Sequence, residues 1–168
     1  MNVEALHDAI AEALTSDATL VAALTAPISA GGCGFASAPG ILLSNRPMAE
    51  IQQMHASLLP AWVLETGGDE AVADEGGEYG LTIGGGSQRI RHPLLVSLVW
   101  KQQDPDTAYR QRLRIPALLI QLCLRLDTFD VPGCEGTAVR ATEPDRAATH
   151  PFHVLSVQID SVLHINRS

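Results

Sequence analysis

The chain contains little positive charge. Its 168 residues include 11 Lys and Arg against 19 Asp and Glu, which gives a formal net charge of -8, and Lys101 is the one lysine. This balance excludes nucleic-acid binding by phosphate neutralisation and docking on an anionic membrane. The remaining bases are arginines, whose planar guanidinium groups favour bidentate ion pairs at protein interfaces.

Cysteine is also scarce. Cys33, Cys123 and Cys134 are odd in number and are not arranged in a CxxC pair. This excludes a disulfide framework and a zinc ribbon, and it favours a reducing compartment.

Long uninterrupted hydrophobic runs are missing as well. No residue between Asp17 and Arg46 is charged, but Pro27, Pro39 and the glycine-rich segment 31–34 break any continuous spanning helix. The first eight residues are acidic and amphipathic, unlike the basic and then apolar order of a signal peptide. We therefore expect a soluble protein that is not exported by that route and has no membrane partner.

The composition that remains suits one folded domain over residues 1–168. Hydrophobic residues make up 46% of the chain and charged residues 18%, and a domain of this length buries enough surface to fold without a metal or a disulfide.

Apolar residues recur at helical spacing near the N-terminus. Steps of three and four predict an amphipathic helix over 3–14, a shorter one over 18–24 and a third over 47–58. Between the last two, segment 29–44 is rich in glycine and small residues, which predicts a flexible loop or arm.

The middle of the chain alternates between strands and glycine-rich loops. Strands are predicted at 61–65, at 79–83 and at 94–100, the last with apolar residues on both faces and hence central. The intervening segment 67–80 contains five acids, no base and several glycines, which predicts a long acidic loop.

A long helix and a hairpin complete the pattern. Asp104 and Pro105 are typical of a helix start, and the helix should run to about residue 126 with a kink or break at Pro116. Its first half should be exposed and its second half buried. Strands at 137–142 and 155–165 follow, so we predict an α+β fold with an antiparallel four- to five-stranded sheet flanked by helices.

No arrangement of reactive residues indicates an active site. His150 and His153 would point to opposite faces of a strand, and Cys33 lacks the glycine that a nucleophile elbow needs at Phe35. His7, His55, His92 and His164 are expected to be surface or packed imidazoles, and Cys123 to belong to the core. We predict no catalytic residue, cofactor or metal.

Two charged clusters have alternative interpretations. Arg110, Arg112 and Arg114 can form a solvated helix face or contact an acidic surface of a neighbouring subunit. The acidic loop can simply be solvated or can line a shared channel. Its acids are Asp69, Glu70, Asp74, Glu75 and Glu78.

The order of the elements resembles that of tail terminator (tail completion) proteins of long-tailed phages. The resemblance rests on the opening helices VEALHDAI and DATLVAAL, the strand PLLVSLVW, the start DTAY of the long helix and the final strand FHVLSVQID. It covers nearly the whole chain, although segment 29–58 is longer than expected for that family.

The resemblance implies a structural virion protein at the junction of tail and head, made in the host cytoplasm. It implies a hexameric ring that caps the tail tube, stops its polymerisation and joins it to the head connector, with DNA passing through the channel. Two alternatives remain: another head-tail joining or neck protein, and a small cytosolic enzyme that uses Cys33 or the pair His150 and His153.

Overall fold

A computed structural model describes residues 3–42, 58–72, 87–144 and 150–166. The described helices are α1 (Val3–Ser16), α2 (Ala18–Thr25), the short 3-10 helix η1 (Ile28–Ala30) and α4 (Pro105–Arg125). The strands are β1 (Gly40–Leu42), β2 (Ala61–Thr66), β3 (Glu70–Ala71), β4 (Ser87–Lys101), β5 (Cys134–Pro144) and β6 (Phe152–Asn166).

The strands form one six-stranded sheet. Its order is β1-β2-β4-β6-β5, and β3 pairs with the N-terminal part of β4. Only β1 and β2 run parallel, and every other pair is antiparallel. The predicted α+β class is therefore confirmed, with more strands than expected and one parallel pair.

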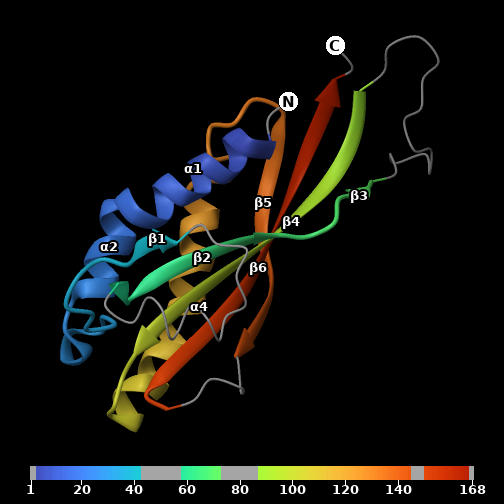
Figure 1. Cartoon of the computed structure of the whole chain (residues 1–168). Helices are drawn as coiled ribbons and strands as arrows, with labels where there is room; N and C mark the ends of the chain where they lie inside the picture. The colour runs from blue at the N-terminus through green and yellow to red at the C-terminus, as the bar shows by residue number, and fades with distance from the viewer. Residues whose placement is uncertain (1–2, 43–57, 73–86, 145–149, 167–168) are drawn as a thin grey trace.

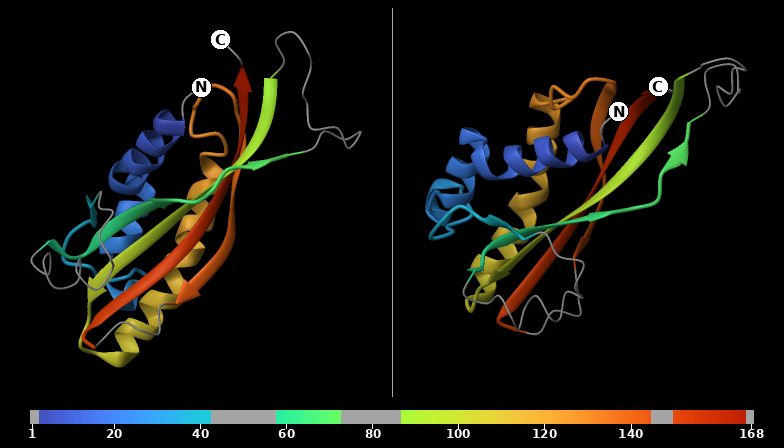
Figure 2. Two further views of the ribbon diagram at one scale, coloured as in Figure 1. Left: turned by 45° about the vertical axis from the view of Figure 1, so that its right-hand side comes forward. Right: turned by 45° about the horizontal axis from the view of Figure 1, so that its top comes forward.

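The three α-helices of the described residues lie on one face of the sheet, and the strands β4 and β6 run along the length of that sheet (Figure 1). Figure 2 shows that the N-terminal part of β4 and the C-terminal part of β6 project beyond the helices. No helix among the described residues is long and apolar enough to cross a membrane.

Side chains along β4 and β6 point alternately to the two faces of the sheet, and those on the helix side form the core. Leu94, Val96, Leu98 and Trp100 face the helices and are fully or almost fully buried, as are Leu155 and Val157 of β6. The opposite face holds a smaller buried cluster, made by Val63, Val99 and Val154.

The two helix starts follow capping rules. The Asp17 carboxylate accepts a hydrogen bond from the Leu20 N–H (2.7 Å) at the start of α2. Asp104 does the same for the Thr107 N–H (2.9 Å) at the start of α4, and Pro105 is the first residue of that helix. These contacts confirm the predicted starts.

Helix α4 is one helix through Pro116, which excludes the predicted break into two helices and leaves the predicted kink as a prediction. The predicted division into an exposed first half and a buried second half is wrong: Ala108 is buried near the start, whereas Leu124 is 77% exposed near the end. One face of α4 packs on the sheet along its whole length, and apolar residues continue onto the other face.

The segment after α2 is tied to the core. Cys33 is fully buried and Phe35 nearly so, and the Phe35 ring meets the Trp100 ring edge-on with centroids 6.2 Å apart. A flexible loop or arm is predicted at 29–44, whereas residues 29–42 pack against α2, α4 and β2.

Other predicted elements divide into two groups. The helices near 3–14 and 18–24 and the strands near 61–65, 94–100, 137–142 and 155–165 are confirmed, although β4, β5 and β6 are longer than predicted. The helix predicted at 47–58, apart from its last residue, and the strand predicted at 79–83 lie outside the described residues.

A buried glutamine joins the helical layer to the sheet. The Gln111 amide accepts a hydrogen bond from Trp100 Nε1 (2.8 Å) and donates one to the Cys33 carbonyl (2.7 Å). Both partners are buried, so loss of the amide leaves a donor and an acceptor unsatisfied.

We expect Gln111→Ala to lower the free energy of unfolding by about 2–4 kcal/mol, because it removes both hydrogen bonds and opens a cavity. Gln121→Ala, on the exposed face of the same helix, should change it by less than about 0.5 kcal/mol. Urea unfolding monitored by Trp fluorescence measures both, and equal effects of the two variants would show that the amide bridge does not stabilise the fold.

Candidate functional site

The three arginines that were considered for a subunit interface have different surroundings. Arg114 Nη1 donates hydrogen bonds to the carbonyls of Ile28 (3.1 Å) and Gly32, so it holds the segment around η1 against α4. Arg112 is half-buried, and its Nη2 lies 3.4 Å from His153 Nδ1. Arg110 is exposed. The structure thus does not bring the three guanidinium groups into one cluster.

Two acids of the predicted acidic loop pair with β4. Glu70 forms an ion pair with Arg91, and the Asp69 carboxylate lies 2.5 Å from His92 Nδ1. Both carboxylates therefore have partners within the chain. Asp74, Glu75 and Glu78 lie outside the described residues.

Asp69 is one end of a chain of hydrogen bonds that reaches α1. His92 Nε2 lies 2.8 Å from His7 Nε2, and the two rings are 5.1 Å apart. His92 is only 2% exposed, on the face of β4 that the helices cover. The array joins three segments: α1, β4 and the link between β2 and β3.

The short distances restrict the protonation of this array. Two imidazole nitrogens can share a hydrogen bond only if one carries a proton and the other does not. His92 donates from Nδ1 to the Asp69 carboxylate, so its Nε2 accepts from His7 when His92 is neutral. Protons on both facing Nε2 atoms would place two donors against each other, so at most one of these two atoms carries a proton.

The Asp69–His92 pair resembles the orienting pair of an acid–base catalyst, but its surroundings differ. In such a pair the outer nitrogen faces the substrate, whereas here it contacts His7 and the ring is buried. Burial also lowers the pKa of His7, and the neighbouring His92 lowers it further, against smaller opposing effects of Asp8 and Asp69. The arrangement fits a structural contact in which His7 is neutral.

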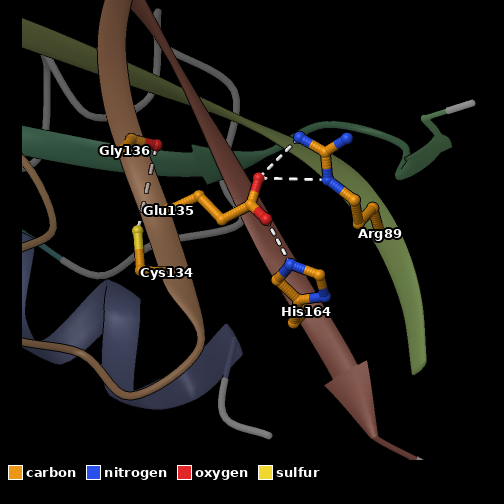
Figure 3. Close-up of polar contacts among 5 residues, drawn as sticks. All are labelled: Arg89, Cys134, Glu135, Gly136 and His164. Carbon is orange, nitrogen blue, oxygen red and sulfur yellow. Dashed lines mark hydrogen bonds and ion pairs between the residues drawn. The ribbon is translucent and has the colours of Figure 1, made fainter. Parts of the chain in front are cut away.

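The face of the sheet opposite the described helices carries a second polar network, which links β4, β5 and β6 (Figure 3). Glu135 accepts two hydrogen bonds from Arg89, at 2.6 and 3.1 Å, and a third contact comes from His164. The Arg89 hydrogen bonds hold the pKa of Glu135 below its ordinary value. The side chains are about one-third exposed, so solvent screens the pair and its contribution to stability is small.

A cleft of about 530 Å³ lies beside this network. Its wall includes Val72, Ala138 and Val162, and its polar groups include Asp160. The Asp160 carboxylate accepts a hydrogen bond from Gln158 (2.7 Å) and lies 3.4 Å from Arg140 Nε. Among the described residues no group of three or more His, Cys, Asp and Glu side chains is placed to hold a metal ion.

Two of the three residues considered for catalysis, Cys33 and His153, have partners or are buried, whereas His150 is exposed. Burial raises the pKa of the Cys33 thiol to about 11, despite the opposing effect of Arg114, so this thiol is protonated at neutral pH. The His153 ring stacks on Trp100, with centroids 5.4 Å apart, and its Nε2 lies 3.0 Å from the Gln102 carbonyl. Burial is the main cause that lowers the pKa of His153.

The outer face of α4 carries most of the large exposed apolar side chains of the described residues. Five large hydrophobic side chains are exposed in the described residues, and four of them lie on this helix: Tyr109, Leu113, Ile120 and Leu124. They are separated by four, seven and four residues, so they follow one stripe along the helix. We call this set the α4 stripe.

Sequence reasoning missed both the His7–His92–Asp69 array and the α4 stripe. The histidines are 85 residues apart, and no local pattern predicts that α1 crosses β4 at that point. The stripe had a signal, because apolar residues of the helix occupy more than the one face that a sheet can cover.

We expect the free energy of unfolding to fall as the pH is lowered from 7 to 5. The pKa of His7 is below its ordinary value of 6.5 in the folded chain, so the unfolded chain binds more protons below that pH and acidification favours unfolding. Urea unfolding across this range should give a shallower dependence of the unfolding free energy on pH for His7→Gln, because that variant lacks the imidazole. Some dependence should remain, because His153 and the carboxylates are present in both chains. Identical slopes would exclude a role for His7.

The rate at which the thiols of Cys33 and Cys123 are alkylated should depend on their burial. Burial raises the pKa of Cys33 and of Cys123 to about 11, so at pH 8 only about 0.1% of each is thiolate. We expect iodoacetamide to modify both at least ~100-fold more slowly in the native chain than in urea, as measured by peptide mass spectrometry. Native labelling at the unfolded rate would contradict the placement of segment 29–42.

Comparison with known proteins yields a likeness of fold. No protein-family model matches the chain, and no curated protein does. Among solved structures the chain is similar to a chain of the virion of a native gene transfer agent (GTA) particle, with a TM-score of 0.51 and 14% sequence identity. The match covers 98% of this chain and 100% of the other. At this identity the likeness concerns the fold, which the two chains share from end to end.

Proposed function

We propose that this chain is a structural protein of a phage-like particle. The observation that carries the proposal is the reciprocal coverage of the match: nearly all of this chain corresponds to all of a chain from a GTA virion. A shared building block inside a larger protein would cover only part of one of the chains. The proposal makes other virion proteins its partners and the virion its location.

Within that class, the proposed role is tail terminator. Six copies form a ring on the last ring of the tail tube, stop further polymerisation and present a surface to the head connector. The element order supports this role, since two short helices, a central strand, a long helix and a final pair of strands follow one another as the resemblance implies.

The charge of the chain suits a channel that DNA passes through. Each copy carries a formal charge of -8, and an acidic lumen repels phosphate, so DNA slides without binding. We propose that the acidic loop lines the channel. Asp69 and Glu70 are held by His92 and Arg91, which leaves Asp74, Glu75 and Glu78 as the residues to face the lumen. A lumen lined by arginine would contradict this part of the proposal.

The enzyme alternative loses support from the surroundings of its residues. Cys33 has a pKa of about 11 and is fully buried, and His153 is held between Trp100 and the Gln102 carbonyl. Cys33 is closed off from a substrate in this position, and the contacts of His153 with Trp100 and Gln102 occupy its ring face and its Nε2.

Tube length tests the proposal. We expect that tail-tube protein polymerised in vitro gives tubes of uncontrolled length, and that adding this chain stops growth and leaves a ring at one end, as seen by negative-stain electron microscopy. A tube length distribution that does not change would remove the terminator role. A chain that leaves tube growth unchanged but binds the head connector would instead be a different neck protein.

A matched variant separates capping from chemistry. The triple variant Cys33→Ala, His150→Ala, His153→Ala removes every residue considered for catalysis and should cap tubes as the unmodified chain does. If capping persists in the unmodified chain and is lost in a correctly folded triple variant, these residues have a role that the proposal does not include.

A further inference from the structure

The α4 stripe is exposed to an extent that is unusual for such side chains. Leu124 is 77% exposed, Tyr109 65%, Leu113 60% and Ile120 43%. From Tyr109 to Leu124 the stripe is about 22 Å long, at 1.5 Å per residue. A contiguous apolar surface on a folded protein marks a contact with another molecule.

The charge beside the stripe restricts what can cover it. Helix α4 (Pro105–Arg125) contains four arginines and one acid, Asp106 in its first turn, within a chain that has a net charge of -8. Arg110 is exposed next to Tyr109. The other three arginines of α4 contact His153, main-chain carbonyls or Asp17 within the chain. Two α4 helices packed against each other would bring the two Arg110 guanidinium groups to one surface, whereas an acidic partner surface would pair with them, so the charge favours an acidic surface over a second α4.

Helix α1 has the complementary properties. Glu4, Asp8 and Glu12 are all exposed, at steps of four residues, so they form one acidic ridge, and residues 3–16 contain no Lys or Arg. Alanines flank the ridge, and Ala5 and Ala9 are only partly buried. Small residues give a shallow surface on which bulky side chains of another helix can rest.

The two helices also match in length. Helix α1 has 14 residues, about 21 Å, against about 22 Å for the α4 stripe. An apolar and basic surface of one copy therefore faces an acidic, alanine-rich surface of equal length on the next copy.

We propose that the α4 stripe of one copy docks on the exposed face of α1 of a second copy, with Arg110 next to the acidic ridge. The inference rests on the proposed function for the presence of several copies in one assembly. Because the two surfaces differ, the contact is heterologous: each copy offers α4 to one neighbour and α1 to another, and such contacts close into a ring when the rotation allows it. Of the three arginines predicted to contact a neighbouring subunit, the proposed contact uses Arg110, whereas Arg112 and Arg114 make contacts inside the chain.

Exchange of charge between the two surfaces tests the proposal in the full chain without tube protein. We expect Arg110→Glu to weaken self-association at least ~10-fold. The triple variant Glu4→Lys, Asp8→Lys, Glu12→Lys should weaken it to a similar extent. Combining all four substitutions in one chain should restore association to within a few-fold of the unmodified protein. Sedimentation velocity across a dilution series at low and high salt measures all four proteins.

Two controls separate the contact from other effects. Lys101→Glu makes the same change in net charge at an exposed site outside α4 and should leave association unchanged. Leu124→Ser removes an apolar side chain from the stripe and should weaken association at high salt as well as at low salt, with little change in thermal unfolding because Leu124 is exposed.

Several outcomes overturn the inference. These are a chain that stays monomeric at millimolar concentration, charge variants that associate normally, and a combined variant that fails to recover although it folds. Stronger association of Arg110→Glu alone would indicate an α4–α4 contact and overturn it too. Self-association by this contact without tube capping would leave the inference standing and remove the terminator role, whereas capping by copies that meet elsewhere would overturn only the inference.

Discussion

The pairing of β4 with β6 is the constraint on which the rest of the structure depends. Fifteen consecutive residue pairs join the two strands, from Ser87 opposite Asn166 to Lys101 opposite Phe152. A shift by one residue would turn every side chain to the other face. The register therefore places the apolar side chains of both strands on the face that the helices cover. It places Arg89 and His164 together on the opposite face, where both contact Glu135.

The sequence allowed prediction of elements whose pattern is local. The period-two alternation of residues 94–100 and the Asp104–Pro105 helix start depend on neighbouring residues, and both are present in the structure. Prediction failed where distant segments decide the outcome. Residues 29–42 look like an arm in isolation, yet Gln111 and Arg114 of α4 hold this segment through its carbonyls. The apolar composition of the second half of α4 predicts that this half is buried, but the sheet covers only one face of the helix.

The same distinction applies to the candidate site. Charged residues near each other in sequence were expected to act together, but Arg110, Arg112 and Arg114 have separate environments. The residues that do act together, His7, His92 and Asp69, come from three segments and are joined only by the fold. For a protein whose proposed role is assembly, the informative features are thus surfaces and inter-segment contacts, which a linear motif search does not detect.

The buried amide of Gln111 has a mechanical consequence. Its two hydrogen bonds, each shorter than 3 Å, reach two different elements, the indole of β4 and the main chain after α2. A tilt of α4 would stretch at least one of these bonds, and hydrogen bonds weaken steeply with distance and angle. Helix α4 is therefore coupled stiffly to the sheet beneath it. A load applied to its outer face passes into the long strands without first deforming the helical layer.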